Sequence, residues 1–313
     1  MSELELIPVE DIKVKKGMTV NELLLSMGRS GGFTAQKLAD ATDIAETMIR
    51  DKDCLRILSF PACIMSTGTR GVIVDMVKND MVDLIITTCG TLDHDIARTY
   101  EDYFKGDFLM DDAKLRDESI SRLGNVLVPD SCYADVLEGE ILPMFDDIFA
   151  ETQSLSTHEI IDQVGARIES EDSLLHQCHV KGVPIVVPGI TDGSFGCQLW
   201  MYYQTHRKLR IDLFADEQML SEMTNHAKMT GAIMIGGGIS KHHVIWWNQF
   251  RGGLDYCIYL TTAQEYDGSL SGARIREAVS WGKVKADAKK MTVEGDATIN
   301  LPIIYAGLAE RLL

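Results

Sequence analysis

Four apolar runs, each ending in a loop of Thr, Gly or Asp, constrain the fold of this chain most strongly. They are MVDLIITTCGT (81–91), VPIVVPGITDGSFG (183–196), TGAIMIGGGISKHH (230–243) and LDYCIYLTTAQEYDG (254–268). Two further strand candidates lie at 55–65 and just before Gly295, and helix-like stretches separate the runs. Near-continuous apolar strands belong in a parallel sheet that is covered on both faces. We therefore predict a Rossmann-like, doubly wound α/β fold with a mostly parallel sheet, helices on both faces and an N-terminal helical extension.

The chain shows no break that would divide it into several large domains. No Pro/Ser-rich linker interrupts its 313 residues, a length that one large α/β domain can fill. Apolar residues recur at helical spacing over 33–48, with Thr34 as the expected N-cap. A second helix is expected around Ala113–Arg122, in an otherwise polar stretch. We predict an N-terminal extension over residues 1–50 and a nucleotide-binding catalytic domain over residues 51–313.

Composition excludes several classes of protein. The formal net charge of −17 leaves no basic surplus to neutralise phosphates, which argues against nucleic-acid binding. The same charge fits attraction of a cationic substrate and, equally, solubility in a salt-rich cytoplasm. No stretch reaches the roughly 18 uninterrupted apolar residues of a transmembrane helix, and residues 1–16 lack the apolar core of a secretory signal. Seven scattered cysteines without a C-x-x-C pair are typical of reduced thiols, so we expect a cytoplasmic protein without membrane association or a metal site.

The strand-end loops are the expected ligand site, because open α/β sheets bind ligands at the carboxyl ends of their strands. Gly236, Gly237 and Gly238 follow the apolar run AIMI and precede a helix, where glycines let backbone N–H groups approach a pyrophosphate. The G-x-G-x-x-G fingerprint is absent, so a tight strand–helix turn explains the same glycines equally well. The H-E-x-x-H, G-x-S-x-G and Walker patterns are also absent, so their hydrolytic and P-loop chemistries lose their main signals.

Lys283 is the candidate for amine chemistry. It follows Trp281 and Gly282 in a turn between an apolar helix and a strand. Burial beside the indole would lower the pKa of Lys283 and leave part of it as the neutral, nucleophilic amine. The alternative is a lysine that simply follows a helix.

Several polar residues near Lys283 are candidates for binding. The loop carboxylates suit an ammonium group or ribose hydroxyls, although acidic residues are more often solvated; they are Glu265, Asp267, Glu277 and Asp296. His242 and His243 are adjacent, so on a helix they point about 100° apart and cannot chelate one metal. One of them is expected to face the site, and at least one of Trp246 and Trp247 is expected to pack in the core.

Six blocks of the chain resemble the deoxyhypusine synthase family, in the family's order. The longest and most specific is TTAQEYDGSLSGARIREAVSWGK (261–283); the others are MVDLIITTCGT, RLGNVLVP, TDGSFG, IGGGISKHH and GDA. The resemblance covers roughly residues 33–310, and the WWNQFRGGLDY and TTCGTLDHDIAR variants are similar to the archaeal branch. It implies that residues 51–313 form an NAD-binding, deoxyhypusine-synthase-like catalytic domain.

The resemblance implies an NAD-dependent transferase that moves the aminobutyl group of spermidine to one lysine of the hypusine-bearing translation initiation factor. The group would travel as an imine on the enzyme lysine that matches Lys283. His242 matches the family's general base or proton relay, Trp281 its aromatic wall and Glu277 a carboxylate at the amine. Asp267 and Gly268 fall in the amine-binding loop.

The resemblance also implies a cofactor site and an assembly. The positions that match the family's NAD contacts are Ser66, Thr88, Gly90, Asp192, Gly236, Gly237, Gly238, Thr262, Ala263, Asp267, Asp296 and Ala297. NAD is expected to stay bound through turnover. The family forms a homotetramer, a dimer of dimers, in which two chains complete each site.

Four positions depart from the family pattern. Cys63 and His94 replace an asparagine and a glutamate of the NAD loops, while Cys197 and Leu270 replace two aspartates that help to hold the polyamine. Another amine donor or acceptor, or compensation by acids such as Asp93 or Glu265, stays open. The alternatives are therefore a homospermidine-synthase-like transfer to a small diamine such as putrescine, and a non-catalytic NAD-binding partner subunit.

Overall fold

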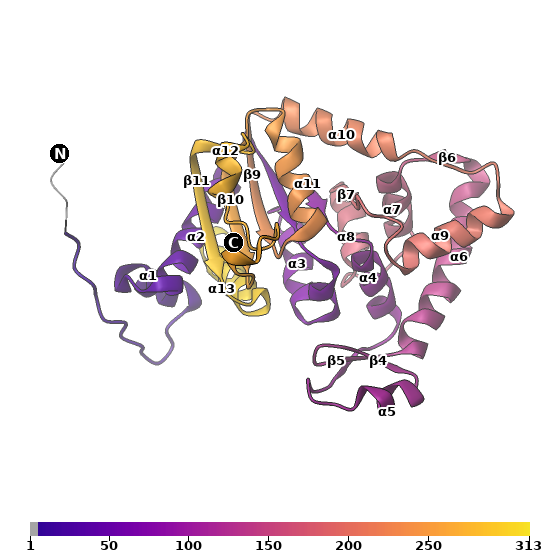
Figure 1. Cartoon of the computed structure of the whole chain (residues 1–313), viewed down its shortest axis with the longest axis horizontal. Helices are drawn as coiled ribbons and strands as arrows, with labels where there is room; N and C mark the ends of the chain where they lie inside the picture. The colour runs from indigo at the N-terminus through magenta and orange to yellow at the C-terminus, as the bar shows by residue number, and fades with distance from the viewer. Residues whose placement is uncertain (1–5) are drawn as a thin grey trace.

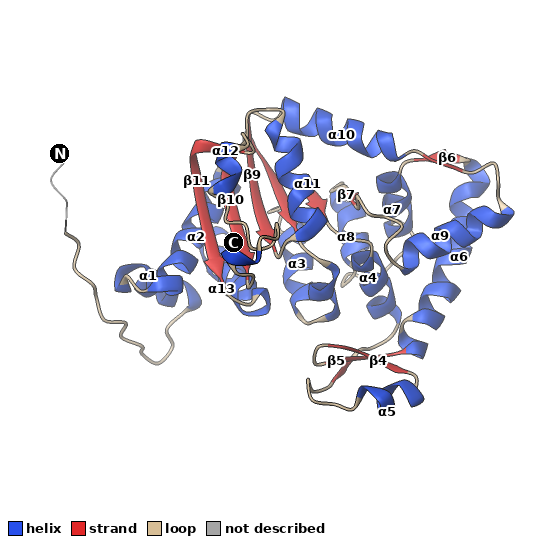
Figure 2. Cartoon of the chain, in the orientation of Figure 1, coloured by secondary structure: helices blue, strands red, loops and turns tan. Residues whose placement is uncertain are grey.

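A six-stranded, fully parallel sheet forms the centre of the molecule (Figures 1 and 2). The structure is a computed structural model that describes residues 6–313, so the first five residues of the predicted extension lie outside the described residues. In sheet order the strands are β11 Val284–Glu294, β10 Leu254–Thr261, β9 Met229–Ile235, β1 Cys54–Ser59, β2 Leu84–Ile86 and β7 Ile185–Val186. The predicted parallel sheet is confirmed, and the short strand expected before Gly295 is the long edge strand β11.

Helices cover both faces of the sheet, as predicted. Alternate strand residues point to opposite faces, so Leu58 and Ile258 belong to one hydrophobic cluster and their neighbours Ile57 and Cys257 to the other. The first cluster packs against α2 Phe33–Arg50, α3 Thr69–Lys78 and α13 Ala297–Leu312. The second packs against α10 Leu213–His226, α11 Gly238–Gln249 and α12 Glu277–Ser280. This layering produces the doubly wound α/β architecture.

The remaining helices extend the first layer toward both ends of the sheet. At the β11 end, α1 Val20–Ser30 packs on α2 and α13 (Figure 1). Beyond β2 and β7 lie α4 Gly90–Tyr100, α6 Ala134–Glu151, α7 Thr157–Gly165, α8 Leu174–Lys181 and α9 Ser194–Thr205. Leu24 and Leu38 of α1 and α2 share the main core, and the domain limit at residue 50 stays a prediction.

Smaller elements decorate this frame. An antiparallel sheet combines β3 Phe104–Lys105, β5 Val126–Pro129 and β4 Ile120–Leu123, next to α5 Asp112–Asp117. The strands β6 Ser154–Leu155 and β8 Arg210–Ile211 pair with each other. Three short 3₁₀ helices are η1 Ala62–Ser66, η2 Asp130–Cys132 and η3 Glu265–Asp267. Within residues 6–313, no helix combines the length and the apolar character needed to cross a membrane.

Local sequence signals explain where two helix predictions were wrong. Helix α2 begins at Phe33 with Gly32 as its N-cap, so Thr34 lies inside the first turn. The helix expected around Ala113–Arg122 ends at Asp117, because Ser119 adopts a left-handed φ of 55° that α-helix cannot accommodate. The residues after this turn continue as β4 instead.

Candidate active site

A large cavity lies at the carboxyl edge of the sheet, where the loops after parallel strands meet. Its volume is about 890 Å³, and it is bordered by the loops that follow β1, β9, β10 and β11. The predicted cofactor residues that line it are Ser66, Gly236, Thr262, Asp296 and Ala297. The position of this cavity is the one expected for a ligand of an open α/β sheet.

The loops around this cavity hold one another in place. The backbone N–H of Ala62 donates to Thr88 Oγ1 at 3.0 Å, which ties the loop after β1 to the loop after β2. Gly90 packs against Ala62 so closely that a Cβ on it would lie 2.9 Å from the Ala62 methyl group. Asp296 caps α13 by accepting the N–H of Thr298 at 2.9 Å. These contacts join the loops after β1 and β2 and fix the start of α13 after β11.

Other predicted cofactor residues lie in loops that follow strands of the sheet, including those after β2 and β7, but do not line the cavity in this chain. They are Thr88, Gly90, Asp192, Gly237, Gly238, Ala263 and Asp267. Gly237 is instead pressed against the segment after η3, where a Cβ would meet Ser271 Oγ at 2.0 Å. Asp267 is exposed and accepts the N–H of Ser269 at 2.6 Å, and Gly268 follows it with a left-handed φ of 72°.

The far wall of the cavity comes from a segment of which the sequence singled out only the block RLGNVLVP (122–129). The three-stranded β3-β5-β4 sheet and its flanks contribute Tyr103, Phe104, Lys105, Phe108, Leu123 and Val126. Arg98 of α4 also lines the cavity and donates to the carbonyls of Met65 and Thr67 at 2.8 and 2.7 Å. The sequence did not predict this wall, because the segment is mostly polar and contains only short apolar stretches.

A second, smaller cavity of about 180 Å³ lies between α11 and α12, and it holds the candidate amine chemistry. Its lining includes Lys283, Trp281 and Glu277, together with Leu270 and Lys241. In the single chain Lys283 is half-buried and Trp281 is 63% exposed, so the burial expected for Lys283 is only partial. The structure thus brings the predicted lysine, indole and carboxylate together.

His242 and an unpredicted residue, Trp246, complete this group. Lys283 Nζ lies 5.4 Å from the ring centroid of Trp281 and 5.8 Å from that of Trp246. His242 stacks on Trp246 at 5.8 Å between ring centroids, one helical turn away on α11. Burial, followed by the nearby charge of Lys283, lowers the pKa of His242. The i, i+4 spacing from His242 is the signal that places Trp246 at the site, because such residues share a helix face.

Lys241 is a second residue that sequence analysis missed. Its side chain is buried, and Nζ donates to the carbonyls of Leu270 and Ala273 at 2.8 and 2.7 Å. The ammonium also lies 3.6 Å from the ring centroid of Tyr259, and burial lowers the pKa of Lys241 to about 8. Lys241 therefore fixes the segment that carries Leu270 into the amine cavity.

The four departures from the family pattern lie in different surroundings. Cys63 lines the large cavity, whereas Cys197 is exposed in the first turn of α9. His94 is in contact with Tyr103, whose hydroxyl is 2.9 Å from Nδ1, and burial lowers the pKa of His94 to about 4. Leu270 lines the amine cavity.

The two acids considered as substitutes are both engaged. Asp93 is buried and accepts the N–H groups of Ser194 and Phe195 at 2.9 and 2.7 Å. Glu265 is exposed and pairs with Arg276 at 2.6 Å. Neither carboxylate lines the amine cavity, where Glu277 is the acid among the residues described.

The two cavities do not meet within one chain. They share no lining residue, and the segment after η3 separates them: Ser271 O accepts from Thr261 Oγ1 on one side, while Leu270 and Ala273 face the other. Trp246 lies about 12 Å along α11 from Gly238, at 1.5 Å per residue. Lys283 itself precedes the amino end of β11, more than about 20 Å of strand away from Glu294 at its carboxyl end.

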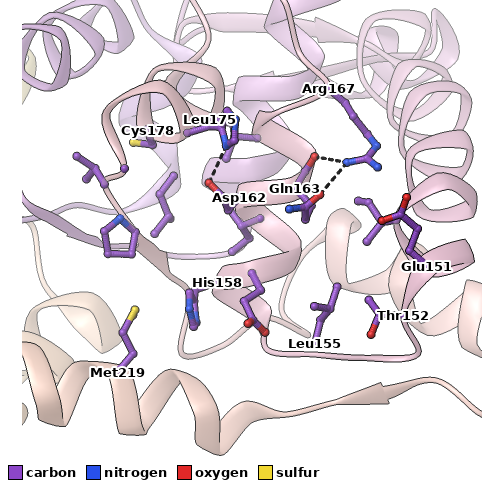
Figure 3. Close-up of a pocket in the computed structure, with 18 residues that line it drawn as sticks. Glu151, Thr152, Leu155, His158, Asp162, Gln163, Arg167, Leu175, Cys178 and Met219 are labelled. Carbon is purple, nitrogen blue, oxygen red and sulfur yellow. Dashed lines mark hydrogen bonds and ion pairs between the residues drawn. The ribbon is translucent and has the colours of Figure 1, made fainter.

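A further cavity of about 700 Å³ is unrelated to this chemistry. It lies between the C-terminal end of α6, α7, α8 and the start of β7 (Figure 3). Its polar lining is already paired, with His179 on Asp162 at 2.9 Å and Arg167 on Gln163 at 2.8 Å. None of the predicted site residues lines it. Within residues 6–313, no cluster of three or more His, Cys, Asp or Glu side chains is arranged to hold a metal ion.

Comparisons with known proteins agree on one family. The family model described as deoxyhypusine synthase matches residues 22–308. Proteins named "Probable deoxyhypusine synthase" from Picrophilus torridus and Thermoplasma acidophilum are 53% and 50% identical, each match covering 96% of both chains. A crystal structure assigned as a deoxyhypusine synthase from Entamoeba histolytica superposes with a TM-score of 0.64 at 19% identity, covering 96% of each chain, which shows a shared fold.

Proposed function

The chain belongs to the deoxyhypusine synthase family, a family of transferases, and we propose that it transfers the aminobutyl group of spermidine to a lysine of the hypusine-bearing translation initiation factor. The observation that carries this proposal is that Lys283 and Trp281 line one cavity, while His242 stacks on Trp246, whose ring lies 5.8 Å from Lys283 Nζ. These residues come from α11 and from the turn before β11. A non-catalytic partner subunit would have no need of a reactive lysine beside a neutral imidazole.

The proposal assigns a separate role to each residue in and beside the amine cavity. Lys283 supplies the amine that takes over the aminobutyl carbon as an imine and hands it to the acceptor lysine. His242, neutral because its pKa is lowered, accepts the proton of the donor's secondary ammonium and returns it to the leaving amine. Glu277 binds the terminal ammonium of the butyl chain, and Trp281 packs along its methylenes.

The large cavity fits NAD, which when bound supplies the two-electron oxidation of the donor and the later reduction of the product. A volume of about 890 Å³ lies in the range of about 300–1,000 Å³ typical of cofactor pockets. Gly236 has a left-handed φ of 66° there, and a Cβ on it would crowd Pro61 at 3.3 Å. Arg98 and Lys105 provide positive charge for a pyrophosphate, and Asp296 provides an acceptor for ribose hydroxyls.

The separation of the two cavities supports an assembly in which two copies complete each site. Large apolar side chains lie exposed on α11 and its C-cap, at Ile239, Trp246 and Phe250, and in the amine cavity, at Trp281. Exposed patches of this kind mark interaction surfaces. We propose that the cofactor cavity of one copy faces Lys283 of another, within a dimer of dimers.

Acceptor identity is tested by supplying spermidine and NAD with either the translation factor or putrescine. Aminobutyl transfer to the factor, detected by mass, is the expected result. Lys283→Ala should abolish it while leaving the dissociation constant for NAD unchanged. Transfer to putrescine alone would instead favour the homospermidine-synthase-like reaction. Leu270, which lines the amine cavity where the family has an aspartate, is the reason to test this alternative.

Sharing of sites between copies is tested by complementation. Lys283→Ala is mixed with a variant such as Asp296→Ala that lacks cofactor binding, and the subunits are exchanged at random. Half of the two-fold dimers then contain one copy of each variant. If sites are shared, one of the two sites in each such dimer is intact, so about a quarter of the wild-type activity should return. If each site lies within one chain, no activity returns.

A further inference from the structure

Two indole rings lie within reach of the Lys283 ammonium. The centroids of Trp246 and Trp281 are 5.8 and 5.4 Å from Nζ, and both values fall inside the roughly 6 Å over which an aromatic face attracts a cation. The rings come from separate elements: Trp246 lies on α11 and Trp281 at the end of α12. The side chains of Trp246 and Trp281 are 41% and 63% exposed, so neither is buried in the hydrophobic core.

The lysine nitrogen has aromatic faces near it instead of hydrogen-bond acceptors. Among the described residues, no carbonyl or carboxylate accepts a hydrogen bond or forms an ion pair with Lys283 Nζ. Lys241, in the same cavity, differs in this respect, because its Nζ is held by two carbonyls. An ammonium has three N–H donors to satisfy, whereas an iminium on the same nitrogen has one. The surroundings of Lys283 therefore suit the larger, less hydrated iminium better than the ammonium.

We propose that Trp246 and Trp281 form a cation-binding cage that stabilises the iminium of a Lys283 adduct, which makes Trp246 a substrate-binding residue. The proposal rests on the carrier role of Lys283 in the proposed function. It also explains how a cavity with Leu270 in it accommodates a cationic intermediate, since the ring faces supply the negative potential that an acid would otherwise provide.

The covalent step that the cage assists involves no net oxidation. A C–N bond forms between Lys283 Nζ and the imine carbon of the oxidised donor, and the C–N bond from that carbon to the leaving diamine breaks. A proton passes from the lysine nitrogen to the leaving amine, and His242, which stacks on Trp246 of the cage, is the proton carrier of the proposed function. The product is a protonated imine on Lys283, within reach of both rings.

The cage can be tested without spermidine, NAD or an acceptor protein. Butanal condenses with the Lys283 amine, its carbonyl oxygen leaves as water, and cyanoborohydride delivers a hydride to the iminium carbon, which leaves a stable butyl-lysine. Peptide mass spectrometry then gives the ratio of butylation at Lys283 to that at the exposed Lys208, which serves as an internal reference. Trp246→Leu should lower this ratio by about three- to thirtyfold, the range expected for one cation–π contact.

Matched variants separate an aromatic effect from a general loss of packing. Trp246→Phe keeps a ring and should lose less than Trp246→Leu, and Trp200→Leu, which removes a 60% exposed indole from α9, should change nothing. Fluorinated tryptophan at all four Trp positions keeps the shape but weakens the ring potential, and should also lower the ratio. This measurement stands even if Trp246→Leu fails to fold or assemble.

The possible outcomes distinguish the cage from the proposed function. An unchanged ratio in Trp246→Leu, or in the fluorinated protein, overturns the cage. A lowered ratio in a protein that does not transfer an aminobutyl group from spermidine supports the cage and removes the proposed function. Normal transfer combined with an unchanged ratio does the reverse.

Discussion

Replacing Asp93 should destabilise the protein more than replacing any exposed helix cap. Asp93 is 1% exposed, yet its carboxylate accepts three hydrogen bonds: from the N–H of Phe195 at 2.7 Å, the N–H of Ser194 at 2.9 Å and the hydroxyl of Tyr133 at 3.0 Å. Two of these donors belong to the first turn of α9, which has no cap from its own loop. Asp93 therefore caps α9 from α4 and fixes the loop that carries Asp192.

The cost of Asp93→Ala follows from these contacts. Three donors lose their acceptor: the N–H of Phe195 is buried, and the N–H of Ser194 and the hydroxyl of Tyr133 are partly buried. An unsatisfied buried donor costs about 1–3 kcal/mol, which sets an upper limit of about 9 kcal/mol on the loss. Burial raises the pKa of Asp93, so removing the carboxylate also removes a desolvation penalty. We expect a net loss of about 3–5 kcal/mol, a large share of the roughly 5–15 kcal/mol by which domains are stable. Asp93→Asn keeps one acceptor oxygen and should lose about 1–3 kcal/mol.

Urea unfolding at one fixed protein concentration measures these differences, because assembly would otherwise shift the midpoint. Asp111→Ala is the matched control: Asp111 caps α5 at the surface by accepting the N–H groups of Ala113 and Lys114, and its loss should cost only about 1 kcal/mol. A midpoint for Asp93→Ala no lower than that of Asp111→Ala would refute the assignment of Asp93 as the buried cap of α9.

Three further predictions concern the site. Because the pKa of His242 is lowered from 6.5, its imidazole stays neutral until the pH falls below that value; kcat/KM should drop only there, and a pH profile of His242→Gln should lack this limb. If the charge of −17 steers a polyamine, kcat/KM for spermidine should fall as salt rises, whereas a flat profile assigns the charge to solubility. Gly237→Ala should lower the free energy of unfolding in urea by about 3 kcal/mol, because its Cβ would lie 2.0 Å from Ser271 Oγ. Gly238→Ala has open space around its Cβ and should lose only about 1–2 kcal/mol, because of its φ of 71°. Equal losses in the two variants would contradict this explanation.

The sheet and the grouping of Lys283 with its neighbours could be predicted from the sequence, because both follow from short local patterns. Apolar runs that end in glycine or threonine mark the strands of a parallel sheet, and their loops then necessarily share one edge. Lys283, Trp281 and Glu277 lie within seven consecutive residues, so any turn that brings one to a cavity brings the others near it.

Other parts of the site depend on contacts that no local pattern carries. Trp246 looks like a core residue in the sequence, and only the crossing of α11 by the turn before β11 brings Lys283 to its ring. Lys241 would be an ordinary helix lysine if Leu270 and Ala273 did not point their carbonyls at it. The contacts join residues 29 to 37 positions apart, a separation at which propensity and periodicity carry no information.

The position of Lys283 at the edge of the sheet matters for its chemistry. β11 is an edge strand, so the turn before it is not enclosed by a further strand, and Trp281 there remains 63% exposed. In the proposed function Lys283 passes its adduct to a side chain of another macromolecule, which needs such an open approach, whereas the proposed cofactor is held at the enclosed carboxyl edge. The proposed sharing of sites uses the same openness, because a second copy would bring its cofactor cavity to Lys283. In that assembly the distance between the two cavities of one chain leaves Lys283 open to a bound oxidant and, in turn, to a protein acceptor.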